Sequence, residues 1–319
     1  KQGAARDVRS PADAESVIGH VVDATADDVA AAVTSARDAA AAWDRLGGAA
    51  RAEILETAAD MLEADAPGFM ALAVSEGGKS LADAVAEVRE AVDFCRYYAQ
   101  QAREGFAAPE TLPGPTGERN TLSLHGRGVF ACISPWNFPL AIFTGQVAAA
   151  LAAGNAVVAK PAEQTPMTAF RAVRLLHAAG VPGEVLQFLP GSGGTVGAAL
   201  TAHPDIAGVA FTGSTEVAKT IHRTLAAGEG PIVPLIAETG GQNAMIVDSS
   251  ALTEQVVTDV VTSAFLSAGQ RCSALRVLFL QDDVADRTLE MLTGAMAELR
   301  IGDPALLETD IGPVIDAEA

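Results

Sequence analysis

A cysteine in a loop is the first residue whose position suggests chemistry. Residues 267–274 read Ser-Ala-Gly-Gln-Arg-Cys-Ser-Ala, which places Cys272 between an expected helix end and an expected strand. A thiolate there is a strong nucleophile, and Arg271 would favour it if its side chain turned toward the sulfur. A loop cysteine with only a packing role gives the same pattern. Cys95 and Cys132 lie on an apolar helical face and in a strand-like run, so we expect both to be packing residues.

A carboxylate stands at the end of another apolar run. Residues 235–243 read Leu-Ile-Ala-Glu-Thr-Gly-Gly-Gln-Asn, with Glu238 shortly before two glycines. A carboxyl group in apolar surroundings holds its proton to higher pH than usual, which suits a general base working near neutrality. The glycines let the backbone approach a flat ligand closely. A glutamate that only caps a turn would also fit this short string.

A rigid loop carries the third candidate. Residues 133–139 read Ile-Ser-Pro-Trp-Asn-Phe-Pro, after an expected strand and before an expected helix. The two prolines restrict the backbone, so Asn137 would be held in place, and a fixed amide N–H is what a developing oxyanion needs. This string is unusual enough to be specific by itself.

Three further loops have groups that suit a dinucleotide. Lys160 and Glu163 follow an expected strand and could bond ribose hydroxyls, although charged loop residues are often only solvated. Residues 190–197 are glycine-rich before a helix, but their G-x-G-x-x-x-G spacing departs from the dinucleotide fingerprint. Ser214 opens a helix whose free N–H groups suit a pyrophosphate, and ordinary capping would explain this serine equally well.

These loops lie between short apolar runs and helical stretches that alternate from residue 128 onward. The alternation predicts an α/β fold, in which helices cover both faces of a parallel sheet and ligands bind at the carboxyl ends of the strands. We expect strands buried on both faces at residues 128–133, 156–159, 185–189, 209–211, 235–237 and 245–247. We expect helices near residues 143–153, 165–179, 195–202 and 215–226.

The flanking regions are predicted from periodicity. The first hundred residues favour helices, the first opened by a capping box of Thr25 and Asp28 and the third burying Val85. Residues 120–125 alternate like an exposed strand that could pair with another subunit. The expected elements outside the alternating region are helices near 29–40, 50–64, 81–106, 252–266 and 284–300, and a strand at 275–280.

Composition excludes several classes of protein. The net charge of −19 disfavours nucleic acid and anionic lipid as partners. Three cysteines without C-x-x-C spacing favour neither a disulfide framework nor a zinc site, and the five histidines show no metal-ligand pattern. No run reaches the roughly 18 apolar residues of a membrane helix. Residues 1–10 are polar and do not resemble a signal peptide, so we expect a cytoplasmic protein.

The candidate segments also resemble a known family. In this order, Pro-Trp-Asn-Phe-Pro, Lys-Pro-Ala-Glu, Phe-Thr-Gly-Ser, Glu-Thr-Gly-Gly and Gly-Gln-Arg-Cys resemble the aldehyde dehydrogenase superfamily over nearly the whole chain. Residues 134–146, 234–249, 267–276 and 310–316 are similar, more narrowly, to the L-glutamate-γ-semialdehyde (Δ1-pyrroline-5-carboxylate) dehydrogenase module of bifunctional proline utilisation A enzymes. The resemblance implies a Rossmann-like doubly wound parallel sheet.

The resemblance also implies NAD-dependent oxidation of the semialdehyde to L-glutamate in proline catabolism. Cys272 would attack the aldehyde to give a thiohemiacetal, with the oxyanion held by Asn137 and the Cys272 N–H. Glu238 would activate water to hydrolyse the thioester that hydride transfer leaves. The implied substrate contacts are Ser273 and Arg271, and no metal is implied. The implied NAD contacts are Ser134, Pro135, Trp136, Lys160, Glu163, Gly193, Val196, Phe211, Thr212, Gly213, Ser214, Thr239 and Gly240.

Domain boundaries and partners follow from the same resemblance. Residues 1–108 and 127–237 would form the NAD-binding domain, 109–126 an arm for homo-oligomerisation, and 238–319 the first part of a truncated catalytic domain. A Glu-x-x-Gly-Pro segment expected of the family is absent. We therefore expect a piece of a longer protein, inactive alone. The parent would be fused to an FAD-dependent proline dehydrogenase, and it could be peripheral to the bacterial inner membrane.

Other functions fit the sequence as well. The same chemistry could act on another small aldehyde, such as succinate semialdehyde. The chain could instead be a non-catalytic module for NAD binding or assembly. Transfer of the acyl group to coenzyme A is disfavoured, because Glu238 suits water as the acceptor. NAD⁺ is expected over NADP⁺, since Glu163 would repel a 2′-phosphate.

Overall fold

A parallel sheet of five strands forms the centre of the computed structural model, which describes residues 5–319. Its strand order is β7-β6-β5-β8-β9, as expected for a doubly wound sheet. The start of the predicted NAD-binding domain at residue 1 lies outside the described residues. The strands are β5 (Val129–Ile133), β6 (Ala156–Lys160), β7 (Leu186–Phe188), β8 (Ile206–Gly213) and β9 (Leu235–Thr239).

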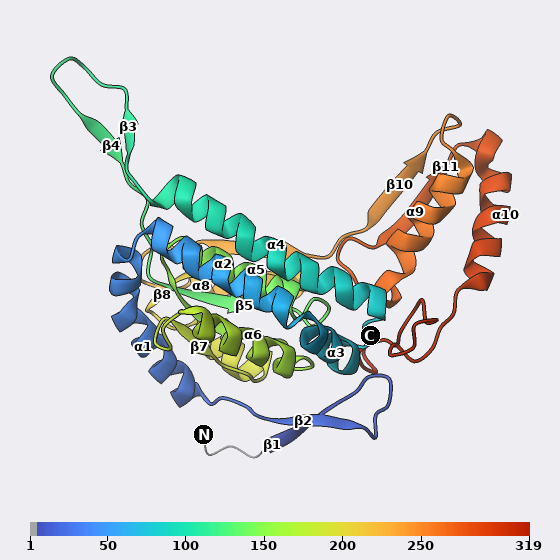
Figure 1. Cartoon of the computed structure of the whole chain (residues 1–319), viewed down its shortest axis with the longest axis horizontal. Coiled ribbons are helices and arrows are strands. Elements are labelled where there is room, and N and C mark those ends of the chain that lie inside the picture. Colours follow the sequence, from blue (N-terminus) through green and yellow to red (C-terminus); the bar gives the residue numbers. More distant parts are fainter. Residues whose placement is uncertain (1–4) are drawn as a thin grey trace.

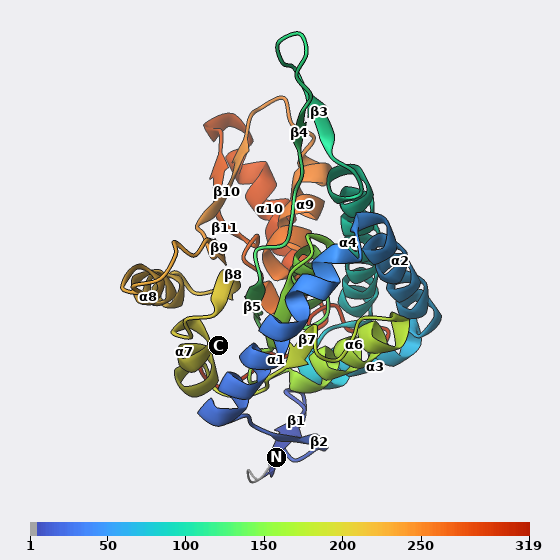
Figure 2. The same cartoon turned by 90° about the vertical axis from the view of Figure 1, so that its left-hand side faces the viewer.

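Helices cover both faces of this sheet, which confirms the predicted α/β class (Figures 1 and 2). One face packs against α1 (Ala26–Arg45), α7 (Ala198–Thr201) and α8 (Thr215–Ala226). The other face packs against α5 (Ala141–Ala152) and α6 (Pro166–Ala179), and these are covered in turn by α2 (Gly48–Ala64), α3 (Ala66–Gly77) and α4 (Leu81–Phe106). The expected helix at 195–202 is a π-helical turn, η1 (Gly193–Gly197), that continues into α7.

Apolar periodicity explains the first and fourth helices. The predicted capping box of Thr25 and Asp28 opens α1, and the expected apolar face of this helix is buried. The bounds of α4 are those predicted, but Val85 is 44% exposed rather than buried. The first turns of α4 bury Ala84 and Glu87 instead, which moves the buried stripe to one side of Val85.

Two antiparallel hairpins project from the helical layers. The strands β1 (Ala5–Arg9) and β2 (Val17–Val22) correct the expectation that the first hundred residues are only helical. Four of the six residues of β2 are Val or Ile, which favour strands. A second hairpin, β3 (Glu110–Leu112) and β4 (Asn120–Leu122), forms an arm that extends away from the molecule (Figure 1). The predicted arm at 109–126 contains it.

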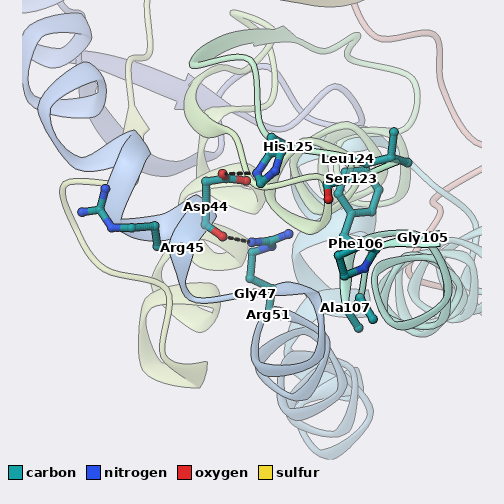
Figure 3. Close-up of a pocket in the computed structure, with 12 residues that line it drawn as sticks. Asp44, Arg45, Gly47, Arg51, Gly105, Phe106, Ala107, Ser123, Leu124 and His125 are labelled. Carbon is teal, nitrogen blue, oxygen red and sulfur yellow. Dashed lines mark hydrogen bonds and ion pairs between the residues drawn. The ribbon is translucent and has the colours of Figure 1, made fainter. Parts of the chain in front are cut away.

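The root of the arm is anchored on Asp44, at the end of α1 (Figure 3). One carboxylate oxygen accepts the Gly126 N–H at 2.8 Å, and the other lies 2.9 Å from Nδ1 of His125. The buried Arg51 guanidinium donates to the Asp44 carbonyl at 2.7 Å. These groups border a cavity of about 230 Å³ between the helices and the arm. Although burial raises the pKa of Asp44, the bonds from Gly126 and His125 outweigh it and hold this pKa below its ordinary value.

A second, smaller layer follows the sheet. Its parallel strands β10 (Asn243–Val247) and β11 (Leu275–Leu280) pack with α9 (Thr253–Phe265) and α10 (Asp282–Glu298), and η2 (Leu266–Gly269) follows α9. Its buried apolar residues form a cluster of their own. Two expectations are wrong here. We expected both β9 and β10 to be buried on both faces, but β9 is an edge strand with Ile236 exposed, and Ile246 of β10 is 82% exposed.

The predicted division into an NAD-binding domain, an arm and part of a catalytic domain stays a prediction. No helix within residues 5–319 combines the length and apolar character needed to cross a bilayer.

Candidate active site

Cys272 and Glu238 line the same cavity, of about 480 Å³. Cys272 is an exposed residue in the turn between η2 and β11, and Glu238 stands near the end of β9. Most of the other lining side chains are apolar, among them Phe94, Tyr98, Phe130, Ile142, Phe211 and Ile236. The structure thus places a potential nucleophile and a potential general base at one largely apolar cavity.

The surroundings of Glu238 differ from those expected. The sequence argument places this carboxyl group in apolar surroundings, but the side chain is exposed. Its exposure follows from the position of β9, which has a neighbouring strand on one side only. Periodicity gives no information about whether an apolar run is central or at an edge.

Asn137 reaches the nucleophile loop by a hydrogen bond. Its side-chain N–H donates to the carbonyl of Gln270 at 2.8 Å. Asn137 does not line the 480 Å³ cavity; it borders a void of about 10 Å³ together with Trp136 and Ser267. The three predicted catalytic residues therefore do not share one void. Cys272 and Glu238 line one cavity, whereas Asn137 is hydrogen-bonded to the loop that carries the thiol.

Arg271 contacts the end of the preceding helix. Its guanidinium donates to the carbonyls of Thr262 and Ser263, at 2.7 and 2.9 Å. These carbonyls belong to the last turns of α9, where helical acceptors lack intrahelical partners. The side chain therefore caps this helix, and the expectation that Arg271 favours the thiolate or binds substrate stays a prediction. Ser273 is exposed beside Cys272, and its predicted contact with substrate stays a prediction.

The other two cysteines are buried, as predicted. Burial raises the pKa of Cys95 and of Cys132 to about 12, because a thiolate loses its hydration there. The Cys132 thiol is directed to the carbonyl of Gln146 at 3.6 Å. Both residues are packing residues, so Cys272 is the thiol of this chain that is placed to react.

The loops expected to hold a dinucleotide meet at one edge of the sheet. Ser134, Pro161, Ser214 and Gly240 each follow a strand of the same parallel sheet, so they lie at the carboxyl ends of those strands. The loops are joined by hydrogen bonds, from Ser134 N–H to the Lys160 carbonyl at 3.1 Å and from Gly193 N–H to the Glu163 carboxylate at 2.8 Å. This is the edge at which ligands bind in such folds.

Individual contacts in these loops vary in accessibility. Lys160 is buried and donates to the Pro161 carbonyl at 2.9 Å, and burial lowers the pKa of its ammonium group although Glu163 and Asp23 oppose this shift. Val196 is 0% exposed, and its side chain packs inward beside Gly191, so its expected contact with adenine stays a prediction. The remaining predicted contacts keep some exposed surface, except the buried Ser134, Phe211 and Thr212.

The whole chain is similar to proteins of a known family. The model of the aldehyde dehydrogenase family matches residues 1–319. The chain belongs to this family. It is 56% identical to the bifunctional protein PutA of Klebsiella aerogenes over all of this chain, which is 24% of that protein. It is 38% identical to 1-pyrroline-5-carboxylate dehydrogenase of Geobacillus kaustophilus, over 97% of this chain and 61% of that protein.

Solved structures give the same fold. Proline utilization A from Bdellovibrio bacteriovorus, in a crystal structure of the enzyme inactivated by N-propargylglycine, superposes with a TM-score of 0.97 at 36% identity. The match covers 100% of this chain and 33% of that one. This confirms the predicted aldehyde dehydrogenase fold. The chain thus spans between about a quarter and about three fifths of the length of the curated relatives described above.

Sequence reasoning missed two polar residues that contact the candidate site. Asn243 donates to the carbonyls of Cys272 and Ala274, at 2.7 and 2.9 Å, and so fixes the backbone on both sides of Ser273. Gln146 lines the cavity and donates to the Thr212 hydroxyl at 2.9 Å. A sign of Gln146 is present in the sequence, because only Thr144 and Gln146 are polar in the largely apolar helix α5. Among residues 5–319 no cluster of three or more potential ligands could hold a metal ion.

Proposed function

We propose that this chain carries the NAD-binding and nucleophile-bearing part of an L-glutamate-γ-semialdehyde dehydrogenase, which oxidises the semialdehyde formed from Δ1-pyrroline-5-carboxylate to L-glutamate. The observation that supports this most is the shared cavity of Cys272 and Glu238 beside the carboxyl edge of a doubly wound sheet. The names of the relatives, PutA and 1-pyrroline-5-carboxylate dehydrogenase, support the choice of substrate.

In the proposed mechanism the Cys272 thiolate attacks the aldehyde carbon and forms a thiohemiacetal. The Asn137 amide and the Cys272 N–H donate to the oxygen as it becomes negative. A bound NAD⁺ would supply the hydride acceptor, and loss of hydride from the thiohemiacetal carbon would leave a thioester on the Cys272 sulfur. Glu238 then takes a proton from water, which attacks the thioester carbonyl and expels the thiolate. Aldehyde, NAD⁺ and water thereby become carboxylate, NADH and protons.

The residues at the sheet edge suit the proposed cofactor. Ser214 is exposed at the beginning of α8, where helical N–H groups favour a pyrophosphate. A side chain at Gly193 or Gly194 would meet no atom within 4 Å, so these glycines leave open space beside the loop of Lys160 and Glu163. Glu163 keeps a carboxylate there, which would disfavour the extra phosphate of NADP⁺.

The proposal extends to the whole protein. The arm of β3 and β4 has free strand edges that would pair with a second copy.

The PutA relatives are named bifunctional, and we propose that the intact protein also carries an FAD-dependent proline dehydrogenase. It would work in the cytoplasm, with the possibility of binding at the inner membrane surface. The 319 residues alone would be inactive, because Glu238 and Cys272 are exposed to water, which a closed active site excludes.

NADH formation tests the proposal. The intact protein should form NADH from pyrroline-5-carboxylate, and Cys272→Ala should abolish it. Cys95→Ala is the matched control, because it removes a buried thiol that does not line the cavity. An undiminished rate in Cys272→Ala would exclude the proposal.

One observation favours a different aldehyde. The described residues that line the cavity include no lysine, arginine or histidine, so a substrate carboxylate would meet no cation there. The lining therefore favours a small aldehyde without a carboxylate as the alternative. Succinate semialdehyde lacks the amino group but has one carboxylate, which would also meet no cation in this cavity. A higher kcat/KM for such an aldehyde than for pyrroline-5-carboxylate, in the intact protein, would support it. Calorimetry with NAD⁺ would detect a module that binds the cofactor without turnover.

A further inference from the structure

The turn that precedes Cys272 has an unusual backbone. Ser267 and Ala268 have φ values of 54°, and they are the two non-glycine residues of the described chain with positive φ. Gly269 follows with φ of 68°. Left-handed conformations are unfavourable for residues with a side chain, so surrounding contacts must hold this turn.

The beginning of α4 supplies those contacts. The Asp83 carboxylate accepts the Ser267 N–H at 3.1 Å, and the Lys79 ammonium group lies 3.4 Å from the Ser267 hydroxyl. Asp83 is itself fixed by the hydroxyl of Ser80, the capping residue of α4, at 3.0 Å. Two charged side chains from one helix end therefore converge on the first residue of the left-handed turn.

The same helix end also holds the loop of Asn137. Lys79 forms an ion pair with Glu87 at 3.1 Å, and the two side chains are 4% and 0% exposed. Glu87 accepts the N–H groups of Leu140 and Ala141, at 2.8 and 3.2 Å, where α5 begins directly after the Asn137 loop. The Lys79 ammonium group lies 4.2 Å from the ring centre of Phe138.

We infer that Lys79, Asp83 and Glu87 are positioning residues, which fix the Cys272 loop and the Asn137 loop relative to each other. We call these three residues the α4 clamp. The inference rests on the proposed function only in naming Cys272 as the nucleophile. Burial supports the role, because the Lys79 and Glu87 side chains are 4% and 0% exposed, and a buried ion pair is held in one arrangement more firmly than a solvated pair.

Asp83→Ala in the intact protein tests the clamp. It removes the acceptor for the Ser267 N–H, so the turn should relax and kcat should fall about tenfold or more while KM changes little. Asp83→Asn should recover most of the rate, because its amide oxygen can accept the same N–H. Asp93→Ala, at an exposed position later in α4, is the matched control.

A second measurement needs no substrate. Iodoacetamide carbamidomethylates Cys272, and mass spectrometry of the Cys272 peptide gives the rate of this reaction. The rate in Asp83→Ala should differ from that of the wild-type protein, and the rate in Asp83→Asn should be close to the wild-type rate. If Asp83→Ala does not fold, the same two measurements on Ser267→Ala test the clamp instead. This variant deletes only the hydroxyl group beside the Lys79 ammonium group. Rates of turnover and labelling that stay at the wild-type level in the folded variants would overturn the clamp. If Cys272→Ala proved fully active, the proposed function would fail, but the labelling rates would still report on the clamp.

Discussion

The side-chain amide of Asn137 donates to the carbonyl of Gln270 at 2.8 Å, and Gln270 precedes Cys272 by two positions. This bond joins a loop that follows β5 of the central sheet to the turn before β11 of the smaller sheet. The α4 clamp also connects the two loops, through contacts of Asp83 with Ser267 and of Glu87 with Leu140. The hydrogen bond therefore helps to set the distance between a potential oxyanion donor and the thiol.

Asn137→Ala removes both this bond and the amide donor. We expect kcat to fall about 10²- to 10³-fold, as is found when an oxyanion donor is deleted, with a smaller change in KM. Steady-state kinetics of the intact protein with pyrroline-5-carboxylate would measure it. A kcat close to that of the unmodified protein would show that Asn137 serves the fold alone.

The three cysteines should differ in their reaction with iodoacetamide. Raising the pKa of a thiol lowers its thiolate fraction at a given pH, and burial raises the pKa of Cys95 and Cys132 to about 12. Between pH 7 and 9 we expect Cys272 to be labelled, and the two buried thiols to stay unmodified in folded protein. Peptide mass spectrometry gives the extent at each site. Labelling of Cys95 or Cys132 as fast as Cys272 would contradict their buried positions.

Glu163→Gln should relax the choice of cofactor. Glutamine keeps an oxygen that can accept the Gly193 N–H, which the carboxylate now accepts at 2.8 Å, so the loop should keep its shape. The negative charge that would repel a 2′-phosphate is lost, and we expect the ratio of kcat/KM for NADP⁺ to that for NAD⁺ to rise about tenfold. Glu184→Gln is a control at an exposed position outside these loops. An unchanged ratio would mean that Glu163 does not face the ribose.

Asp44→Ala should weaken the root of the arm in a pH-dependent way. The pKa of Asp44 is lower in the folded protein than its ordinary value, so its stabilising effect is complete above that value and is lost as the pH falls through the folded pKa. At pH 7 we expect the free energy of unfolding to fall by about 1–3 kcal/mol. The difference in free energy of unfolding between Asp44→Ala and the unmodified protein should stay constant down to about pH 5. This difference should become smaller below about pH 4.

Urea unfolding at several pH values measures this difference. Asp38→Ala serves as the control, because Asp38 lies on the same helix with its side chain 65% exposed. If the loss of unfolding free energy in Asp44→Ala became larger as the pH falls, the assigned direction of the Asp44 pKa shift would be wrong.

Sequence patterns predicted the sheet and the positions of its loops well, because strand–helix alternation and strand ends are local features. They failed where the outcome depends on distant neighbours. Glu238 is exposed because β9 is an edge strand, and Arg271 caps α9 because that helix ends beside it. The turn from Ser267 is held by Lys79 and Asp83, which lie far away in the sequence. No local pattern could have assigned that contact.

The smaller layer of β10, β11, α9 and α10 has an apolar cluster that shares no residue with the large core. Its buried members are few, namely Val247, Val256, Val257, Val260, Leu275 and Leu292. Local opening is easiest where few apolar contacts must be broken, so this layer should open without the rest of the chain. Its backbone amides should then exchange with deuterium earlier than those of β5 and β6, and the nucleophile loop would lose its ordered state in that first event.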